Sequence, residues 1–227
     1  MVIQSSELRI KPVLRSLFAR EPEWQFSLML ALEAVFLFVA VPALSTGNGD
    51  RDIVTILHLV LAGSVIGLAA NSTWVRSVLA VSFGLTLLGR LLPGALPQIT
   101  SVAMSLFYNA LVIAVVARAV FGRGRVNAHR IAGAVFIYLN VALLFALIYN
   151  ALSIVDPNAL SGVPVAGRFS ELVHFSITTL TTIGDKQVSP QSSFARSLMD
   201  LETIIGQLFP AILLSRLVGL HLFRERQ

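Results

Sequence analysis

The sequence predicts an all-α membrane protein with six transmembrane helices and, between the fifth and the sixth, a re-entrant helix and loop. Three observations lead to this fold class. The 227-residue chain is 56% hydrophobic and only 13% charged, a composition typical of integral membrane proteins. It contains six apolar segments that can each cross a ~30 Å hydrocarbon core at ~1.5 Å per helical residue. Between the last two lies the stretch 169–190, which is too short and too polar to cross.

The predicted spans are separated by turn-forming and charged residues. Glycine, asparagine and proline gather in the connectors, as at Thr46–Gly49 and Pro93–Gly94. The spans are Ser27–Leu44, Ile53–Ala70, Val75–Leu92, Ser101–Phe121, Arg130–Leu152 and Phe194–Phe223.

The N-terminal segment 1–24 is predicted to lie on the cytoplasmic surface of the membrane. In a helix over 8–20, apolar residues share one face and basic residues surround it, as in helices bound to anionic lipid. A loosely ordered basic tail is the alternative. No apolar run follows a basic segment here, so a cleavable signal peptide is not expected.

Positive charge is distributed unequally between the two predicted sides of the membrane. With a cytoplasmic N-terminus, twelve of the 17 lysines and arginines fall on that side and five on the other. This asymmetry predicts both termini in the cytoplasm of a multi-pass protein of the cell membrane, plasma or inner. The basic excess therefore indicates topology, with the lipid bilayer as a partner and no nucleic acid.

Three units follow the N-terminal segment. Residues 25–122 form a four-helix bundle, 123–129 a basic cytoplasmic linker, and 130–227 the last two helices with their loop. A voltage sensor needs arginines at every third position of the fourth helix. That helix carries only Arg118, near its cytoplasmic end, so an arginine ladder is absent.

Four polar side chains inside the spans are expected to face other helices rather than lipid. Glu33 and His58 either form a modulatory proton or ligand site or are structural buried groups, and the structural interpretation is favoured. Asn109 and Asn140 are expected to form hydrogen bonds between helices.

The stretch between the fifth and sixth spans predicts a short helix and a loop. Ser170 and Glu171 can cap a helix that runs to about Thr181, and its apolar residues would pack on neighbouring spans. The C-terminal end of this helix carries negative partial charge and would point toward the membrane centre. Four such ends around an axis favour a cation there.

The residues after this helix resemble the pore signature of the potassium-channel superfamily, the tetrameric cation channels. The matching segment is Thr179–Gly184, and the resemblance extends over roughly residues 130–222. It implies a homotetramer in which Glu171, Thr178, Thr179 and Thr181 belong to the pore helix.

The resemblance also implies a selectivity filter over Thr182, Ile183, Gly184, Asp185 and Lys186. Thr182, Ile183 and Gly184 would hold a permeant monovalent cation, K⁺ or Na⁺, through a side-chain hydroxyl and backbone carbonyls. Potassium-selective members continue with tyrosine, glycine and aspartate, whereas this chain has Asp185–Gln187. The tyrosine normally braces the filter from behind. An acid directly after the glycine, here Asp185, is similar to the bacterial sodium–potassium channels and the animal cyclic-nucleotide-gated channels, so the resemblance implies a filter of the non-selective type and a weakly selective pore.

Lys186 opposes this interpretation. Four lysines at an outer mouth would repel cations unless they pair with Asp185 or Glu171 or extend into solvent. A ring of unpaired lysines would lower conductance, alter ion preference or block the pore.

The sixth span contains two features of a pore-lining helix. Gly206 stands at the family's hinge glycine and, with Pro210, can form a gating hinge or a static kink. Asp200 and Glu202 need partners, for which Arg196, Thr181 and the back of the filter are candidates. Structural bracing is favoured over direct ion contact.

The expected function is thus a passive, weakly selective K⁺/Na⁺ channel. The alternatives are a potassium-selective channel with a rearranged outer filter, a non-conducting membrane subunit that keeps the pore fold, and a secondary transporter. Nucleophile–base pairs, metal-ligand clusters and phosphate-binding loops are missing from the sequence, so neither enzyme activity nor a cofactor is expected.

Overall fold

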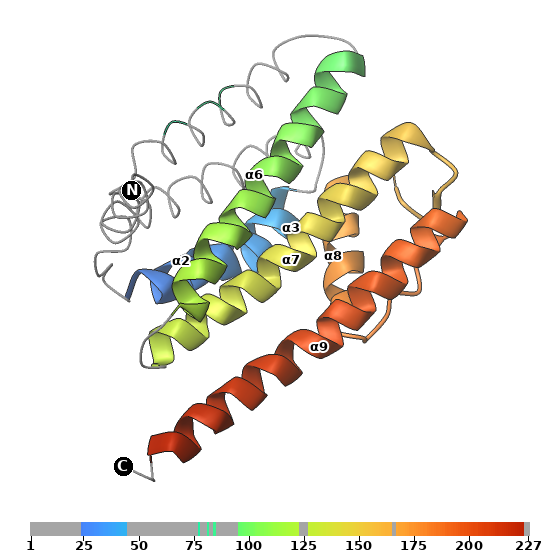
Figure 1. The fold of residues 1–227 in the computed structure, drawn as a ribbon. Coiled ribbons are helices and arrows are strands. Elements are labelled where there is room, and N and C mark those ends of the chain that lie inside the picture. The colour runs from blue at the N-terminus through green and yellow to red at the C-terminus, as the bar shows by residue number, and fades with distance from the viewer. Residues whose placement is uncertain are drawn as a thin grey trace, which may run out of the picture.

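The computed structural model describes residues 24–44, 77, 81, 84, 95–122, 127–164 and 167–224 of the chain (Figure 1). These parts are almost entirely helical, and four stretches within them are long and apolar enough to cross a membrane. This supports an all-α membrane protein. The N-terminal helix over 8–20, the second and third predicted spans with His58 (apart from 77, 81 and 84), and Arg123–Val126 of the linker lie outside the described residues.

The described long helices coincide with four of the predicted spans, and their ends differ from the predicted ones by up to six residues. The first span is α2 (Trp24–Val35), η1 (Phe36–Ala40) and α3 (Val41–Leu44), and the fourth is α6 (Ala95–Phe121). The fifth and sixth are α7 (Ala128–Val155) and α9 (Ser193–Arg224), with the shorter helix α8 (Arg168–Leu180) between them.

The first span changes to a π-helix just before a proline. The Val41 amide donates to the Phe36 carbonyl, an i→i−5 bond. Pro42 follows and has no amide hydrogen for the regular i→i−4 ladder. The wider turn therefore accommodates the proline without ending the helix.

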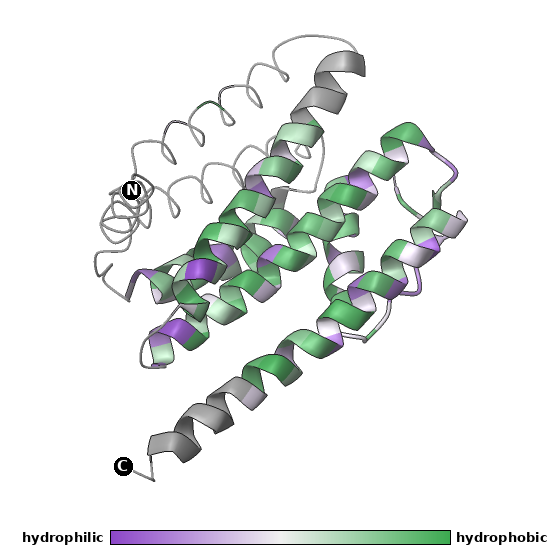
Figure 2. Ribbon diagram, in the orientation of Figure 1, coloured by the Kyte–Doolittle hydropathy of each residue, from purple (hydrophilic) through white to green (hydrophobic). Residues whose placement is uncertain are grey.

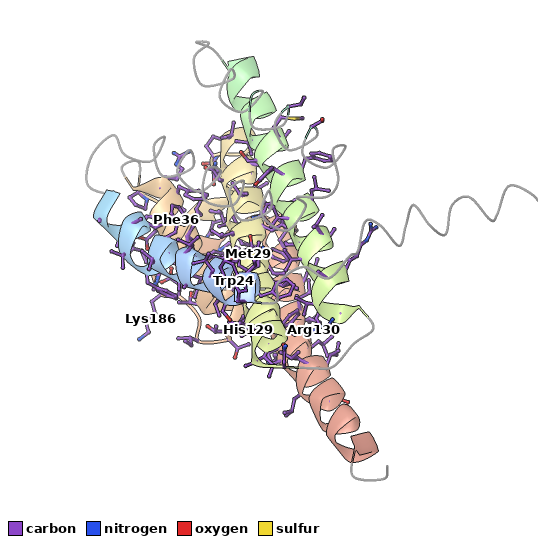
Figure 3. The ribbon with its side chains drawn as sticks, turned by 90° about the vertical axis from the view of Figure 1, so that its left-hand side faces the viewer. Trp24, Met29, Phe36, His129, Arg130 and Lys186 are labelled. Atoms are coloured by element: carbon purple, nitrogen blue, oxygen red, sulfur yellow. The ribbon has the colours of Figure 1, made fainter. Side chains whose placement is uncertain are left out.

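Helix α7 is the centre of the described fold and packs against α2, α6, α8 and α9 (Figure 1). Its first turn is capped by the Asn127 side chain, which accepts from the Arg130 amide at 3.0 Å. Two hydrogen bonds, Ser27–His129 and Glu33–Asn140, join α2 to α7. The residue numbers rise in the same order along both helices. The two helices thus run parallel, and Figure 3 shows Trp24 close to His129 in that view.

Two short strands close the segment that carries α8 and its loop. Strand β1 (Leu160–Ser161) pairs antiparallel with β2 (Ser189–Pro190). Gly162 follows β1 with a φ of 80°, and a β-carbon there would lie 1.8 Å from the Gln187 carbonyl oxygen. Glycine is therefore needed both for its backbone conformation and for the close approach of the two chains.

Helix α9 begins at a serine cap and presents a wide exposed face. The Ala195 amide donates to the Ser192 hydroxyl at 3.1 Å. Apolar residues make up much of the coloured part of α9 (Figure 2), and the C-terminal part of the helix extends beyond the other helices (Figure 1). Among the exposed apolar residues are Leu201, Ile204, Leu208 and Ile212. This face needs lipid or another protein surface to cover it.

Candidate functional site

Helix α8 begins earlier than the sequence pattern predicts. The N-cap is Gly167, in the left-handed conformation at φ 73°, and it provides no side-chain cap. The prediction that Ser170 caps the helix is wrong, because Ser170 already lies inside it. Glu171 does lie in the first turn, and the helix ends at Leu180 with Thr181 as its C-cap.

The chain reverses sharply after α8. The Thr178 carbonyl accepts from the amides of Ile183, at 2.9 Å, and Gly184, at 3.0 Å. Thr182 and Gly184 have positive φ angles of 62° and 79°, a conformation that a threonine adopts only at some cost. A tight turn therefore holds Thr182–Gly184 directly beyond the C-terminal end of the helix.

Two of the four threonines in this segment use their hydroxyls for hydrogen bonds within α8. The hydroxyls of Thr178 and Thr181 donate back to carbonyls of their own helix, Thr181 to Ile177 at 2.7 Å. Thr182 is exposed, and its hydroxyl makes no hydrogen bond with a residue that the structure describes. Thr182 is thus the threonine best able to offer its hydroxyl to a ligand.

The Asp185 carboxylate is hydrogen-bonded to backbone amides and not to Lys186. Its carboxylate accepts from the amides of Gln187, at 2.9 Å, and Val188, at 3.4 Å. Within the described part of one subunit Lys186 pairs with neither Asp185 nor Glu171. Its side chain is exposed at the edge of the molecule (Figure 3).

A cavity of about 560 Å³ lies between the loop, α8 and α9. The residues that line it include Thr179 and Phe175 of α8, Thr182 of the loop, and Arg196 and Met199 of α9. No aromatic side chain from the loop fills this space. The loop has no tyrosine where potassium-selective channels have one.

Glu202 is fully buried behind α8. It accepts a hydrogen bond from the Tyr149 hydroxyl at 2.9 Å and is hydrogen-bonded to the Ser176 hydroxyl. The bracing role expected for Glu202 agrees with these contacts, but the expected partners Arg196 and Thr181 are wrong. Asp200 is exposed on α9.

The end of α8 is in direct contact with Gly206. A β-carbon at Gly206 would lie 1.8 Å from the Leu180 carbonyl oxygen. The Tyr138 hydroxyl reaches both the Leu180 carbonyl, at 3.0 Å, and the Gly206 carbonyl, at 3.4 Å. Pro210 is four residues after Gly206 and has no amide to donate to the Gly206 carbonyl, so Tyr138 partly replaces that bond. Helix α9 is continuous through both residues.

A second buried polar group lies on the opposite side of α7. Asn140 donates to Glu33 at 2.7 Å and accepts from Asn109 at 3.3 Å. The prediction that Asn109 and Asn140 form interhelical hydrogen bonds is confirmed, and Glu33 faces the bundle as expected.

Sequence reasoning missed three residues of the site, Tyr138, Tyr149 and Ser176. The available signal is that two tyrosines inside an apolar span each carry a hydroxyl that needs a partner. The identity of those partners depends on helix packing and is not local in sequence.

Comparison with known proteins agrees with this geometry. Residues 137–220 match the model of a family described as ion channel. No curated protein and no solved structure gives a significant match. The matched range holds most of α7, all of α8 and the loop, and α9 as far as Leu220. The part of this membrane protein that builds the site is therefore similar to an ion channel of the potassium-channel-like superfamily.

Proposed function

We propose that the chain is one subunit of a homotetrameric channel that passes monovalent cations passively, with weak selectivity between K⁺ and Na⁺. One observation carries the proposal. The loop Thr182–Gly184 lies at the C-terminal end of a buried short helix, yet it is itself exposed, with Ile183 78% exposed. An exposed loop of this kind at membrane depth has to line a water-filled path or meet protein.

The exposed face of α9 supports assembly around an axis. Ser193, Asp200 and Gln207 are exposed and spaced by seven residues, close to two helical turns at ~3.6 residues per turn. They form a polar stripe, whereas Leu201, Leu208 and Ile212 form an apolar stripe beside it. A polar stripe suits water or a neighbouring subunit, and the apolar one suits lipid or protein. Four copies would bring four loops together, as a filter of backbone carbonyls requires.

The chemistry of the loop favours cations. The C-terminal end of α8 carries partial negative charge, and Thr182 offers an uncommitted hydroxyl close to that end. Backbone carbonyls in such a loop can replace the hydration shell of a cation.

Weak selectivity follows from the residues after Gly184. In this position Asp185 bonds to backbone amides and Lys186 is exposed, so neither supports a further ordered layer of carbonyls. The cavity behind the loop leaves the filter without an aromatic brace. A looser filter discriminates less between K⁺ and Na⁺.

The proposed topology has both termini in the cytoplasm of a cell membrane. The parallel course of α2 and α7 agrees with a six-span chain, in which odd-numbered spans all start on the same side. The excess of positive charge favours the cytoplasm as that side. In this topology the loop opens to the outer side, and the division at residues 25–122, 123–129 and 130–227 separates a peripheral bundle from the pore domain.

The test is ion flux and reversal potential with purified protein in liposomes. Weak selectivity predicts a reversal potential between the K⁺ and Na⁺ equilibrium potentials under opposed gradients. A value at the K⁺ potential would favour the potassium-selective alternative. The control is the triple variant Asp185→Tyr, Lys186→Gly, Gln187→Asp. If only the variant conducts, the native chain is a non-conducting subunit.

A further inference from the structure

The middle of α8 is fastened to two other helices through one buried acid. Glu202 on α9 has 0% exposure. The Tyr149 hydroxyl on α7 donates to Glu202 Oε2 at 2.9 Å, and Ser176 on α8 lies against Glu202 Oε1. The Ser176 hydroxyl also contacts the Ala142 carbonyl of α7 at 2.7 Å. Three elements of the pore domain thus meet at one polar cluster.

The hydrogen count of this cluster favours a neutral form of the acid. Ser176 has one hydroxyl proton but two oxygen neighbours, Ala142 O and Glu202 Oε1. The carbonyl and an ionised carboxylate are both acceptors, so the single serine proton cannot make a full hydrogen bond to each of them. A proton on the carboxyl group would let Ser176 donate to Ala142 and accept from Glu202. Tyr149 donates to the other carboxyl oxygen, and no cation among the described residues forms an ion pair with Glu202.

We propose that Glu202 is a positioning residue of the ion pathway, which as a neutral acid fastens α8 to α7 and α9. The turn Thr182–Gly184 is bonded to the Thr178 carbonyl, only two residues after Ser176. A displacement of Ser176 is therefore transmitted to the loop. The effect on permeation rests on the proposed function, whereas the proton on Glu202 and its hold on α8 do not.

The protonation state of Glu202 is tested by infrared spectroscopy of the purified protein. The expected result is a carboxylic acid C=O band that is present in the wild type, shifts in D₂O and disappears in Glu202→Gln. Its absence from the difference spectrum between wild type and Glu202→Gln would show an ionised carboxylate and overturn the proposal. Glu33→Gln is the matched control, because Glu33 is a buried acid on α2, and this change should leave the Glu202 band in place.

The positioning role is tested through variants that keep or remove the hydrogen bonds. Glutamine keeps one donor toward Ser176 and one acceptor toward Tyr149, so Glu202→Gln should leave the Na⁺/K⁺ permeability ratio within about twofold of the wild type. Glu202→Leu and Ser176→Ala should change it about fivefold or more, the factor that one lost buried hydrogen bond corresponds to. Equal effects of Glu202→Gln and Glu202→Leu, or a similar effect of Glu33→Gln, would contradict the proposal.

A readout without conduction separates this proposal from the proposed function. The chain has no cysteine, so Thr181→Cys introduces a single reactive thiol at the exposed end of α8. Its modification rate by a water-soluble reagent should be unchanged by Glu202→Gln and altered about fivefold or more by Glu202→Leu. Equal rates in both backgrounds would show that Glu202 does not hold α8, whether or not the protein conducts.

Discussion

The Leu180 carbonyl occupies the space that a side chain at position 206 would need. A β-carbon at Gly206 would lie 1.8 Å from the Leu180 oxygen and 2.7 Å from its carbonyl carbon. These obstacles are backbone atoms, so they move only if α8 or α9 moves. The glycine therefore sets how closely α9 approaches the C-terminal end of α8.

Gly206→Ala should displace the end of α8 and destabilise the fold by about 1–3 kcal/mol or more, as overpacking does. The measurement is thermal unfolding of the purified protein together with the permeability ratio. Gly84→Ala is the matched control, since a β-carbon there meets nothing within 4 Å. If Gly206→Ala alters channel opening but neither unfolding nor permeability, the glycine acts as a hinge and its close packing is unimportant.

Tyr138→Phe removes the hydroxyl that reaches the Leu180 and Gly206 carbonyls but keeps the ring, which lies 5.5 Å from the ring of Phe209. We expect a loss of about 1 kcal/mol, typical of one hydrogen bond. Tyr138→Leu should cost more, because it also removes the aromatic contact. Chemical denaturation in detergent measures both variants. An unchanged stability of Tyr138→Phe would mean that the hydroxyl contributes nothing, and equal losses in the two variants would mean that the ring contact contributes nothing.

Asn140→Ala should destabilise the protein by about 2–5 kcal/mol, because it leaves Glu33 and Asn109 buried without this partner. Asn150→Ala on the same helix is the control: Asn150 is half-buried and has no hydrogen bond from its side chain to a described residue. The double variant Asn140→Leu, Glu33→Leu should recover part of the loss, as apolar replacement of a whole polar group often does. A double variant less stable than Asn140→Ala would contradict the assignment of Glu33 as a structural group.

Lys186→Gln should raise single-channel cation conductance at low salt, because it removes four exposed positive charges from the outer mouth of the proposed tetramer. The increase should shrink at high salt, where the Debye length falls to about 3 Å at 1 M. Lys186→Arg keeps the charge and is the control. Unchanged conductance at low salt would show that the lysines extend away from the ion path.

The predictability of the structure differs between its local and its long-range features. Helix α8 and its loop could be predicted because polarity, length and the threonine cluster are encoded in consecutive residues. The start of α8 at Gly167 was missed because a left-handed glycine competes with the more common Ser170–Glu171 cap. Glu202 was recognised as a bracing residue, but its partner Ser176 is 26 positions away and is brought near only by packing. Asn109 and Asn140 were predicted correctly because an amide inside an apolar span has few options besides another helix.

Helix α7 holds polar partners on two opposite sides, so a rotation of this helix would act on both groups of contacts. Asn140 faces α2 and α6, whereas Tyr149, nine residues later and about two and a half turns on at ~3.6 residues per turn, faces Glu202 on α9. A rotation of α7 about its axis would break one set of these bonds unless α8 and α9 turned with it. A movement of α2 and α6 could therefore reach the loop through the body of α7, independently of the C-terminal end of α9.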